Sequence, residues 1–261
     1  MQGLTIKDAD GKDIVIDASS LDDLVRRIRG EVIFANDPGY EEARQVWNAM
    51  IDRQPAVIVR CADADDVIAC VQMAAKHNLK TSVRGGGHNV AGNAVSDGGL
   101  VIDLSRMHEV VVDEERMIAS VQGGATLGDV DGGTQRFALA TPLGIVPQTG
   151  VAGLTLHGGL GWLLRRFGTS ADNLVGAEIV TADGVLRHAG EDENSDLLWA
   201  LRGGGGNFGV VTSLELKLHR VGPRVWAGLV LYSLDDMGEV LLALDRYMSE
   251  APEELTANVL L

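Results

Sequence analysis

The stretch AVIVRCADADDVIACVQMAAKHNLKTSVRGGGHN, residues 56–89, decides the fold. Its apolar run at 56–60 predicts a buried strand, the apolar spacing over 64–78 predicts a helix, and 80–84 returns as a second strand. These three segments make a short β-α-β unit. The second strand runs directly into three consecutive glycines, Gly85 to Gly87, so the unit ends in a loop with unusual backbone freedom.

Segments on either side predict further helices and short strands. Upstream, Ser20 is a plausible N-cap for a helix over 21–29, and a second helix is expected over 41–50. Downstream, we expect helices at 126–136 and 195–202, a hairpin at 176–188 that turns at Asp183-Gly184, and strands at 99–104, 108–113, 117–122 and 209–220. The pattern predicts one α+β domain, with antiparallel or mixed pairing in its second half, to about residue 220.

A new unit is predicted after Val221-Gly222-Pro223. It has a strand at 225–233, a helix at 235–250, and an apolar end at 251–261 that reads as an interrupted strand. About 40 residues are at the lower limit for an independent core. We therefore expect a domain of residues 1–222, followed by residues 223–261 as the beginning of a truncated second domain.

Composition excludes several classes of function. The 261 residues carry 22 Lys plus Arg against 37 Asp plus Glu, a net charge of −15, which disfavours nucleic acid and anionic membranes as partners. The two cysteines, Cys61 and Cys70, have no CxxC spacing, and none of the six histidines pairs with another at ligand spacing, so no metal site is expected. Without a secretory leader or an 18-residue apolar run, the expected location is the cytoplasm.

Two glycine-rich segments invite a cofactor-binding interpretation. GGGNFG at 204–209 satisfies GxGxxG, but a predicted helix precedes it and a strand follows, the reverse of the order in a dinucleotide-binding βαβ unit. The other segment is RGGGHNVAG at 84–92, where successive backbone N–H groups can form a concave nest for a diphosphate, helped by the charge of Arg84. A tight turn with an incidental histidine is the alternative interpretation of that loop.

A set of ordered motifs resembles the berberine-bridge-enzyme-like FAD-linked oxidases of the vanillyl-alcohol oxidase superfamily. The motifs are YEEARQVWNAMIDRQPAVIVRCADADDV (40–67), RGGGHNVAG (84–92), GGLVIDLS (98–105), Gly123-Gly124-Ala125, PQTGVAGLTLHGGLGWLLRRFGTSADNL (147–174) and DLLWALRGGGGNFGVVT (196–212). The resemblance covers the chain from about residue 30 to 223. It implies a PCMH-type FAD-binding domain of two subdomains, followed by a substrate domain.

The resemblance also implies particular cofactor contacts. His88 would be bonded covalently to the flavin 8α-methyl carbon, with mere contact between His88 and the flavin as the alternative. Many relatives carry a second attachment cysteine where this chain has Val146, so only one covalent bond is expected, and His157 replaces a commoner glycine. The implied FAD-binding residues are Arg84, Gly85, Gly86, Gly87, His88, Asn89, Gly92, Thr149, Gly150, Gly153, Gly158, Gly159, Gly161, Gly209 and Val210.

The implied reaction is hydride transfer from an alcohol, a lactol or a natural-product substrate to flavin N5, with reoxidation by O2. The partners are then a small-molecule substrate and O2. The catalytic base of relatives lies in the substrate domain, so no residue of this chain is assigned that role. Two alternatives stay open: a catalytically incomplete FAD-binding fragment, and a reductase of the related cell-wall-precursor type, which the His-bearing loop disfavours.

Overall fold

The computed structural model describes residues 3–260 and has an α+β fold with two main sheets, as predicted. The first sheet has the order β3-β4-β6-β5, in which β6 pairs in parallel with both β4 and β5 and the edge strand β3 is antiparallel. Its strands are β3 (Glu31–Phe34), β4 (Val57–Arg60), β5 (Thr81–Arg84) and β6 (Leu100–Asp103). The predicted β-α-β unit is therefore present, with β6 inserted between its two strands.

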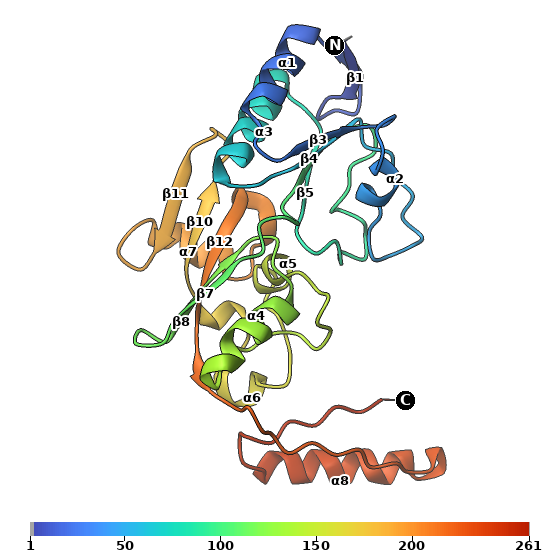
Figure 1. The fold of residues 1–261 in the computed structure, drawn as a ribbon. Coiled ribbons are helices and arrows are strands. Elements are labelled where there is room, and N and C mark those ends of the chain that lie inside the picture. The colour runs from blue at the N-terminus through green and yellow to red at the C-terminus, as the bar shows by residue number, and fades with distance from the viewer. Residues whose placement is uncertain (1–2, 261) are drawn as a thin grey trace.

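Helices α1 (Ala18–Arg27) and α3 (Ala64–His77) lie side by side and bury their apolar residues against this sheet (Figure 1). Asp63 caps α3 by accepting a hydrogen bond from the Asp66 backbone N–H, and Asn78 ends it in the left-handed conformation. Helix α1 begins earlier than predicted. The cap is Asp17 rather than Ser20, because the Asp17 carboxylate accepts the Ser20 backbone N–H.

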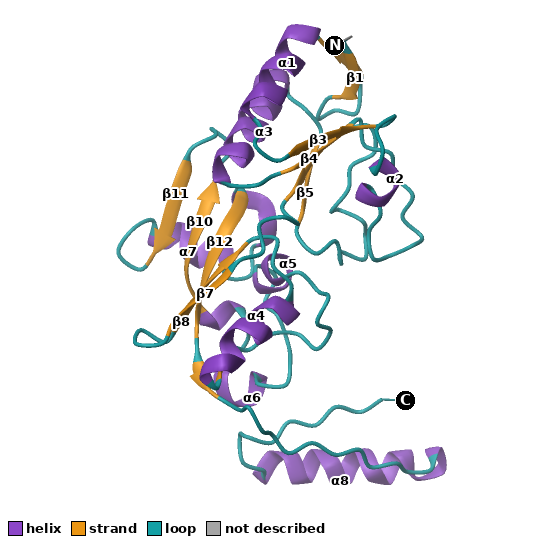
Figure 2. Ribbon diagram, viewed as in Figure 1, coloured by secondary structure: helices purple, strands orange, loops and turns teal. Residues whose placement is uncertain are grey.

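The second sheet is antiparallel, with the order β11-β10-β12-β8-β7. Its inward side chains form a second core with α4, α5 and α7, which gather beside it (Figure 2). The hairpin turning at Asp183-Gly184 is confirmed as β10 and β11. The elements are β7 (Val110–Asp113), β8 (Ile118–Gln122), β10 (Leu174–Val180), β11 (Leu186–Gly190), β12 (Val210–Lys217), α4 (Leu127–Thr134), α5 (Val151–Thr155) and α7 (Ser195–Leu201).

Smaller elements complete the chain, and most of them were not anticipated. They are the hairpin of β1 (Leu4–Lys7) with β2 (Asp13–Ile16), the pair β9 (Leu139–Ala140) with β13 (His219–Arg220), the helices α2 (Tyr40–Ala43) and α6 (Leu164–Phe167), and the 3-10 turns η1 (Gln135–Phe137), η2 (Ala171–Asn173), η3 (Gly205–Phe208) and η4 (Leu234–Asp236). Within residues 3–260, no helix combines the length and the apolar character needed to cross a bilayer.

Three predicted elements are wrong. The helix expected over 41–50 is only α2, because the residues after it pack against the glycine loop, where the Trp47 N–H donates to the Gly87 carbonyl. No strand forms over 225–233 or over 251–260, since neither segment has a neighbouring strand to pair with among the described residues. Residue 261 lies outside the described part.

The C-terminal unit projects from the rest of the fold. Its helix α8 (Met237–Glu250) lies at the end of the molecule opposite to α1, with the C-terminus beside it (Figure 1). The side chain of Arg165 in α6 holds this unit by donating to the carbonyl oxygens of Met248, Ala251, Pro252 and Leu255. Many apolar side chains of the unit are exposed, including Trp226, Leu231 and Leu260.

Candidate functional site

The loop after β5 presents a run of free backbone donors. Among residues 3–260, no acceptor is found for the N–H groups of Gly86, Gly87, His88 and Asn89. Two carbonyls of the loop are occupied, because Gly87 accepts from the Trp47 N–H at 3.1 Å and Asn89 accepts from the Gly92 N–H at 3.0 Å. Gly87 has φ +70°, and a left-handed residue in such a run turns successive N–H groups toward one point. This backbone geometry is typical of an anion-binding nest.

A second loop, which contains Thr149 and Gly150, lies directly against the first. A Cβ atom on Gly86 would be 2.4 Å from the Gly150 nitrogen, and one on Gly150 would be 2.4 Å from the Gly86 nitrogen. The second loop is held in turn by α4, since the Leu127 N–H donates to the Thr149 carbonyl at 2.9 Å. The tertiary structure therefore brings the backbone of the glycine loop at Gly86 into direct contact with the backbone of the second loop at Gly150.

His88 lies at the junction of these loops. Its Nδ1 is 3.5 Å from the Thr149 Oγ1, and its ring stacks on the indole of Trp47 with centroids 5.4 Å apart and planes inclined by 20°. Burial lowers the pKa of His88 below its ordinary value. The imidazole is therefore neutral at pH 7 and able to act as a nucleophile.

Arg84 contributes differently from the prediction. Its guanidinium donates to the Ala43 carbonyl and lies 4.0 Å from the carboxylate of Asp103, which is buried beneath the loop. Asp103 is also 3.6 Å from the Arg60 Nε, so it offsets the charge of Arg84 only in part, and the free backbone N–H groups add to the positive potential of the loop. Gly92 closes the same loop, where its N–H donates to the Asn89 carbonyl at 3.0 Å.

The remaining predicted residues border the second loop or the start of β12. Gly153 and Gly158 have nothing within 4 Å of an added Cβ atom, so open space lies beside them. Gly159 and Gly161 pack against neighbouring chain, at Ser170 and Leu143 respectively. His157 keeps a negative φ, so replacing the commoner glycine strains nothing. The Nδ1 of His157 is 2.7 Å from the Gly153 carbonyl oxygen.

Gly209 and Val210 belong to the junction between the two sheets. A Cβ atom on Gly209 would be 2.3 Å from the Val180 carbonyl oxygen, and the side chain of Val210 is buried in the first core. Helix α7 precedes the GGGNFG segment and strand β12 follows it, as predicted, so this GxGxxG lacks the dinucleotide-binding context.

Sequence reasoning missed the segment that supports the loop from behind. Besides Trp47, the Asn48 side chain donates to the Val90 carbonyl at 2.8 Å, and the Arg53 guanidinium donates to the carbonyls of Ala91, Gly92 and Val95. The apolar spacing over 41–50 predicts a helix, whereas Trp47 and Asn48 lie in an irregular segment after α2. The only available signal was their inclusion in the motif at 40–67.

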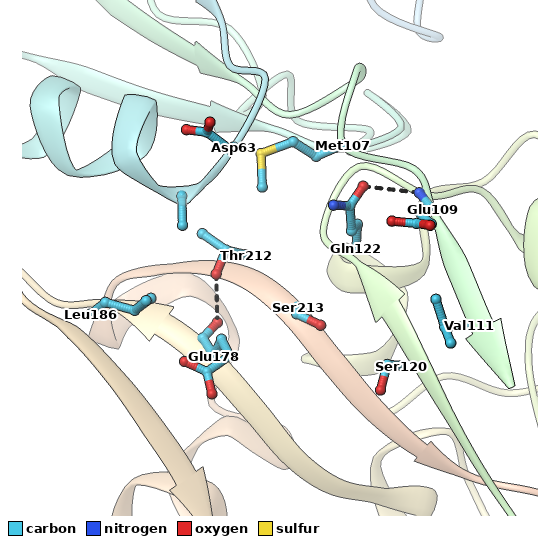
Figure 3. A pocket seen from close by; sticks show the side chains of 11 residues that line it. Asp63, Met107, Glu109, Val111, Ser120, Gln122, Glu178, Leu186, Thr212 and Ser213 are labelled. Carbon is cyan, nitrogen blue, oxygen red and sulfur yellow. Dashed lines mark hydrogen bonds between the residues drawn. The ribbon is translucent and has the colours of Figure 1, made fainter. Parts of the chain in front are cut away.

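A separate hollow of about 310 Å³ lies between the start of α3 and the outer face of the second sheet (Figure 3). None of the predicted site residues lines it. Several of its polar groups are already bonded within the fold: Asp63 to Arg29, and the Thr212 hydroxyl to the Glu178 carbonyl. The candidate site is therefore the loop junction around His88 rather than this hollow.

Comparison with known proteins identifies the family of the chain. A family model described as FAD binding domain matches residues 55–190. The (R)-6-hydroxynicotine oxidase of Paenarthrobacter nicotinovorans is 36% identical over 234 residues, which cover 89% of this chain and 51% of that protein. The chain thus spans about half the length of the curated relatives it matches.

Solved structures extend the likeness to the fold. The crystal structure of 6-hydroxy-D-nicotine oxidase from Arthrobacter nicotinovorans superposes with a TM-score of 0.81 at 37% identity, covering 85% of this chain and 50% of that one. Glucooligosaccharide oxidase from Acremonium strictum, whose FAD is described as 6-S-cysteinyl, 8α-N1-histidyl, gives a TM-score of 0.72 at 34% identity and covers 77% of this chain and 42% of that one.

Proposed function

The chain belongs to the FAD binding domain family, among the berberine-bridge-enzyme-like FAD-linked oxidoreductases, and from this we propose that it is the flavin-binding part of an oxidase with FAD attached through His88. The observation that carries the proposal is the junction of the free N–H groups of residues 86–89 with the neutral imidazole of His88.

The residues present fit FAD. Four unpaired backbone donors in one turn suit a diphosphate, which a chain of net charge −15 would otherwise repel. The open space beside Gly153 and Gly158 leaves room for the cofactor near the same loops. The N–H groups of residues 86–89 would hold the diphosphate, and His88 would hold the isoalloxazine ring.

Bound FAD supplies the acceptor for a hydride from a substrate carbon, with O2 as the final oxidant. The residues of this chain anchor and orient that group. For attachment, an imidazole nitrogen of His88 would bond to the 8α-methyl carbon in place of one methyl hydrogen, and the imidazole would lose its N–H proton. The two electrons and two protons would pass to O2, giving H2O2. Val146 has no nucleophilic atom, so we propose one covalent bond only.

We propose substrates of the alcohol, lactol or nitrogen-containing natural-product class. Support comes from the names of the relatives, which are oxidases of 6-hydroxynicotine and of oligosaccharides. Choosing among these classes requires residues that cover the reactive face of the flavin. A panel with one member of each class, scored by anaerobic bleaching of flavin absorbance, would rank them.

The test of the proposal is acid precipitation of purified protein after incubation with FAD. Flavin absorbance is expected to stay with the wild-type pellet and to leave with the supernatant of His88→Ala. His108→Ala is the matched control, because His108 is exposed and lies outside the loop junction. If flavin is released from all three proteins, the covalent bond is refuted; if the protein binds no flavin, the cofactor assignment for this chain is refuted.

A second candidate function is a flavin-binding unit without turnover of its own. It is favoured by the exposed apolar side chains at 225–260, which no described part of this chain covers. The two candidates differ under anaerobic conditions. An oxidase is bleached by its substrate, whereas a binding unit is bleached by dithionite but by no member of the substrate panel.

A further inference from the structure

The segment that follows α2 supports His88 from one side. The Trp47 N–H donates to the Gly87 carbonyl at 3.1 Å, which fixes the backbone immediately before His88. The next residue, Asn48, holds the Val90 carbonyl two residues after His88. Between these two anchors, the Trp47 indole stacks on the imidazole with centroids 5.4 Å apart. Both the backbone and the ring of His88 are therefore held by neighbouring residues of one segment.

We propose that Trp47 is the positioning residue for His88, whose indole fixes the plane of the imidazole so that it meets the flavin 8α-methyl carbon. This inference rests on the proposed covalent attachment and assigns to Trp47 no contact with substrate. Thr149 restrains the ring at its edge, with Oγ1 at 3.5 Å from Nδ1. Trp47 restrains its face, and together they limit rotation of the ring about its side-chain bonds.

The physical reason is the mobility that His88 would otherwise have. The flanking residues Gly87 and Asn89 are held through their carbonyl oxygens, whereas their N–H groups bond to nothing else in residues 3–260, so the backbone contacts leave the side-chain rotation of His88 unrestrained. The exposed fraction of Trp47 is 62%, which is unusual for a residue serving only as core. A ring held near its attack geometry reacts as part of an intramolecular pair, and a displacement of about 1 Å can slow such a reaction about 100-fold.

The first test separates attachment from binding. Apo-protein is mixed with FAD, and both the rate of formation of acid-stable flavin and the noncovalent dissociation constant are measured for Trp47→Leu, Trp47→Phe and the wild type. We expect Trp47→Leu to slow attachment by about 10- to 100-fold, with a much smaller change in affinity, and Trp47→Phe to restore most of the rate because it keeps a stacking ring. Trp199→Leu is the control, since Trp199 is an exposed tryptophan of α7 away from the loops.

Equal attachment rates in wild type and Trp47→Leu would overturn the proposal. So would a parallel loss of rate and affinity that Trp47→Phe does not rescue, which indicates a merely structural role.

The second test works without FAD. A protonated imidazole quenches the fluorescence of an indole on which it stacks, so wild-type emission should fall with decreasing pH, with a midpoint below the ordinary histidine pKa of about 6.5. The step should disappear in both Trp47→Phe and His88→Ala. If the wild type lacks acid-stable flavin but shows this step, the covalent proposal fails while the positioning contact stands. A step that persists in His88→Ala would refute the contact itself.

Discussion

Gly86→Ala tests whether the two halves of the site meet backbone to backbone. The added Cβ atom would lie 2.4 Å from the Gly150 nitrogen and 2.6 Å from the Gly150 Cα, whereas ordinary contacts begin near 3.4 Å. The loops must therefore separate by about 1 Å, because neither obstacle is a side chain that can rotate away. Overpacking of this kind costs about 1–3 kcal/mol. For a chain of this size the melting temperature should fall by about 2–6 °C.

The same displacement should affect the cofactor site. Moving the first loop by about 1 Å carries His88 away from Thr149, so covalent attachment should slow by up to about 100-fold. Melting curves and acid-stable flavin are the two measurements. Gly132→Ala is the control: it has no atom within 4 Å of the added Cβ, and in helix α4 it should stabilise by about 0.5–1 kcal/mol. Wild-type melting and attachment in Gly86→Ala would refute the close approach.

Three further predictions follow from other contacts. Gly153→Ala should weaken FAD binding without lowering the melting temperature, because the added Cβ meets only open space in the protein; unchanged affinity would place FAD elsewhere. His219 is half-buried, and its pKa lies below the ordinary value of 6.5, first because of this burial and second because of the charges of Lys217 and Arg166. The unfolded state therefore binds the proton more readily, so the free energy of unfolding should fall as pH decreases below about 6.5, by up to about 1.4 kcal/mol per pH unit. His219→Gln should reduce this slope, which urea titrations at several pH values would measure. Arg165→Ala should speed proteolytic cleavage within 221–260 at least about tenfold, because each hydrogen bond lost has a charged donor and contributes about 1.5–3 kcal/mol. Equal cleavage rates would show that Arg165 does not hold α8.

Most elements of the fold could be predicted from local pattern. The strand at Val57–Arg60 is a continuous apolar run, as a buried strand requires, the helix at Ala64–His77 shows the period of 3.6 of a half-buried helix, and both form where expected. The segments 41–50 and 225–233 also have the pattern of a helix and of a strand, but the first is helical only at its start and the second forms no strand. The first contacts the glycine loop instead of completing a helix, and the second has no strand to pair with in the described chain. In both cases a segment distant in the sequence decides whether the element forms, and a local pattern carries no information about that segment.

The candidate site divides in the same way. The tight loop at Gly85–Gly87 and the histidine beside it can be predicted from the sequence, because only residues without side chains can turn their N–H groups inward so tightly. Trp47, in contrast, lies 41 positions before His88 in an unremarkable stretch, and only the stack of the two rings reveals it. The charge of Arg84 also looked available to a ligand until the structure placed Asp103 beside it.

By itself, the sequence determined the β-α-β unit, the glycine run that ends it, the position of His88 as the proposed nucleophile, and the presence of Val146 where many relatives carry a cysteine. These properties depend on residue type and on neighbours a few positions away. The tertiary structure alone decided that Thr149 meets His88 across 61 positions, that Gly86 touches Gly150, and that Trp47 covers the imidazole. Such contacts depend on how two sheets and their loops pack together, which no local period encodes.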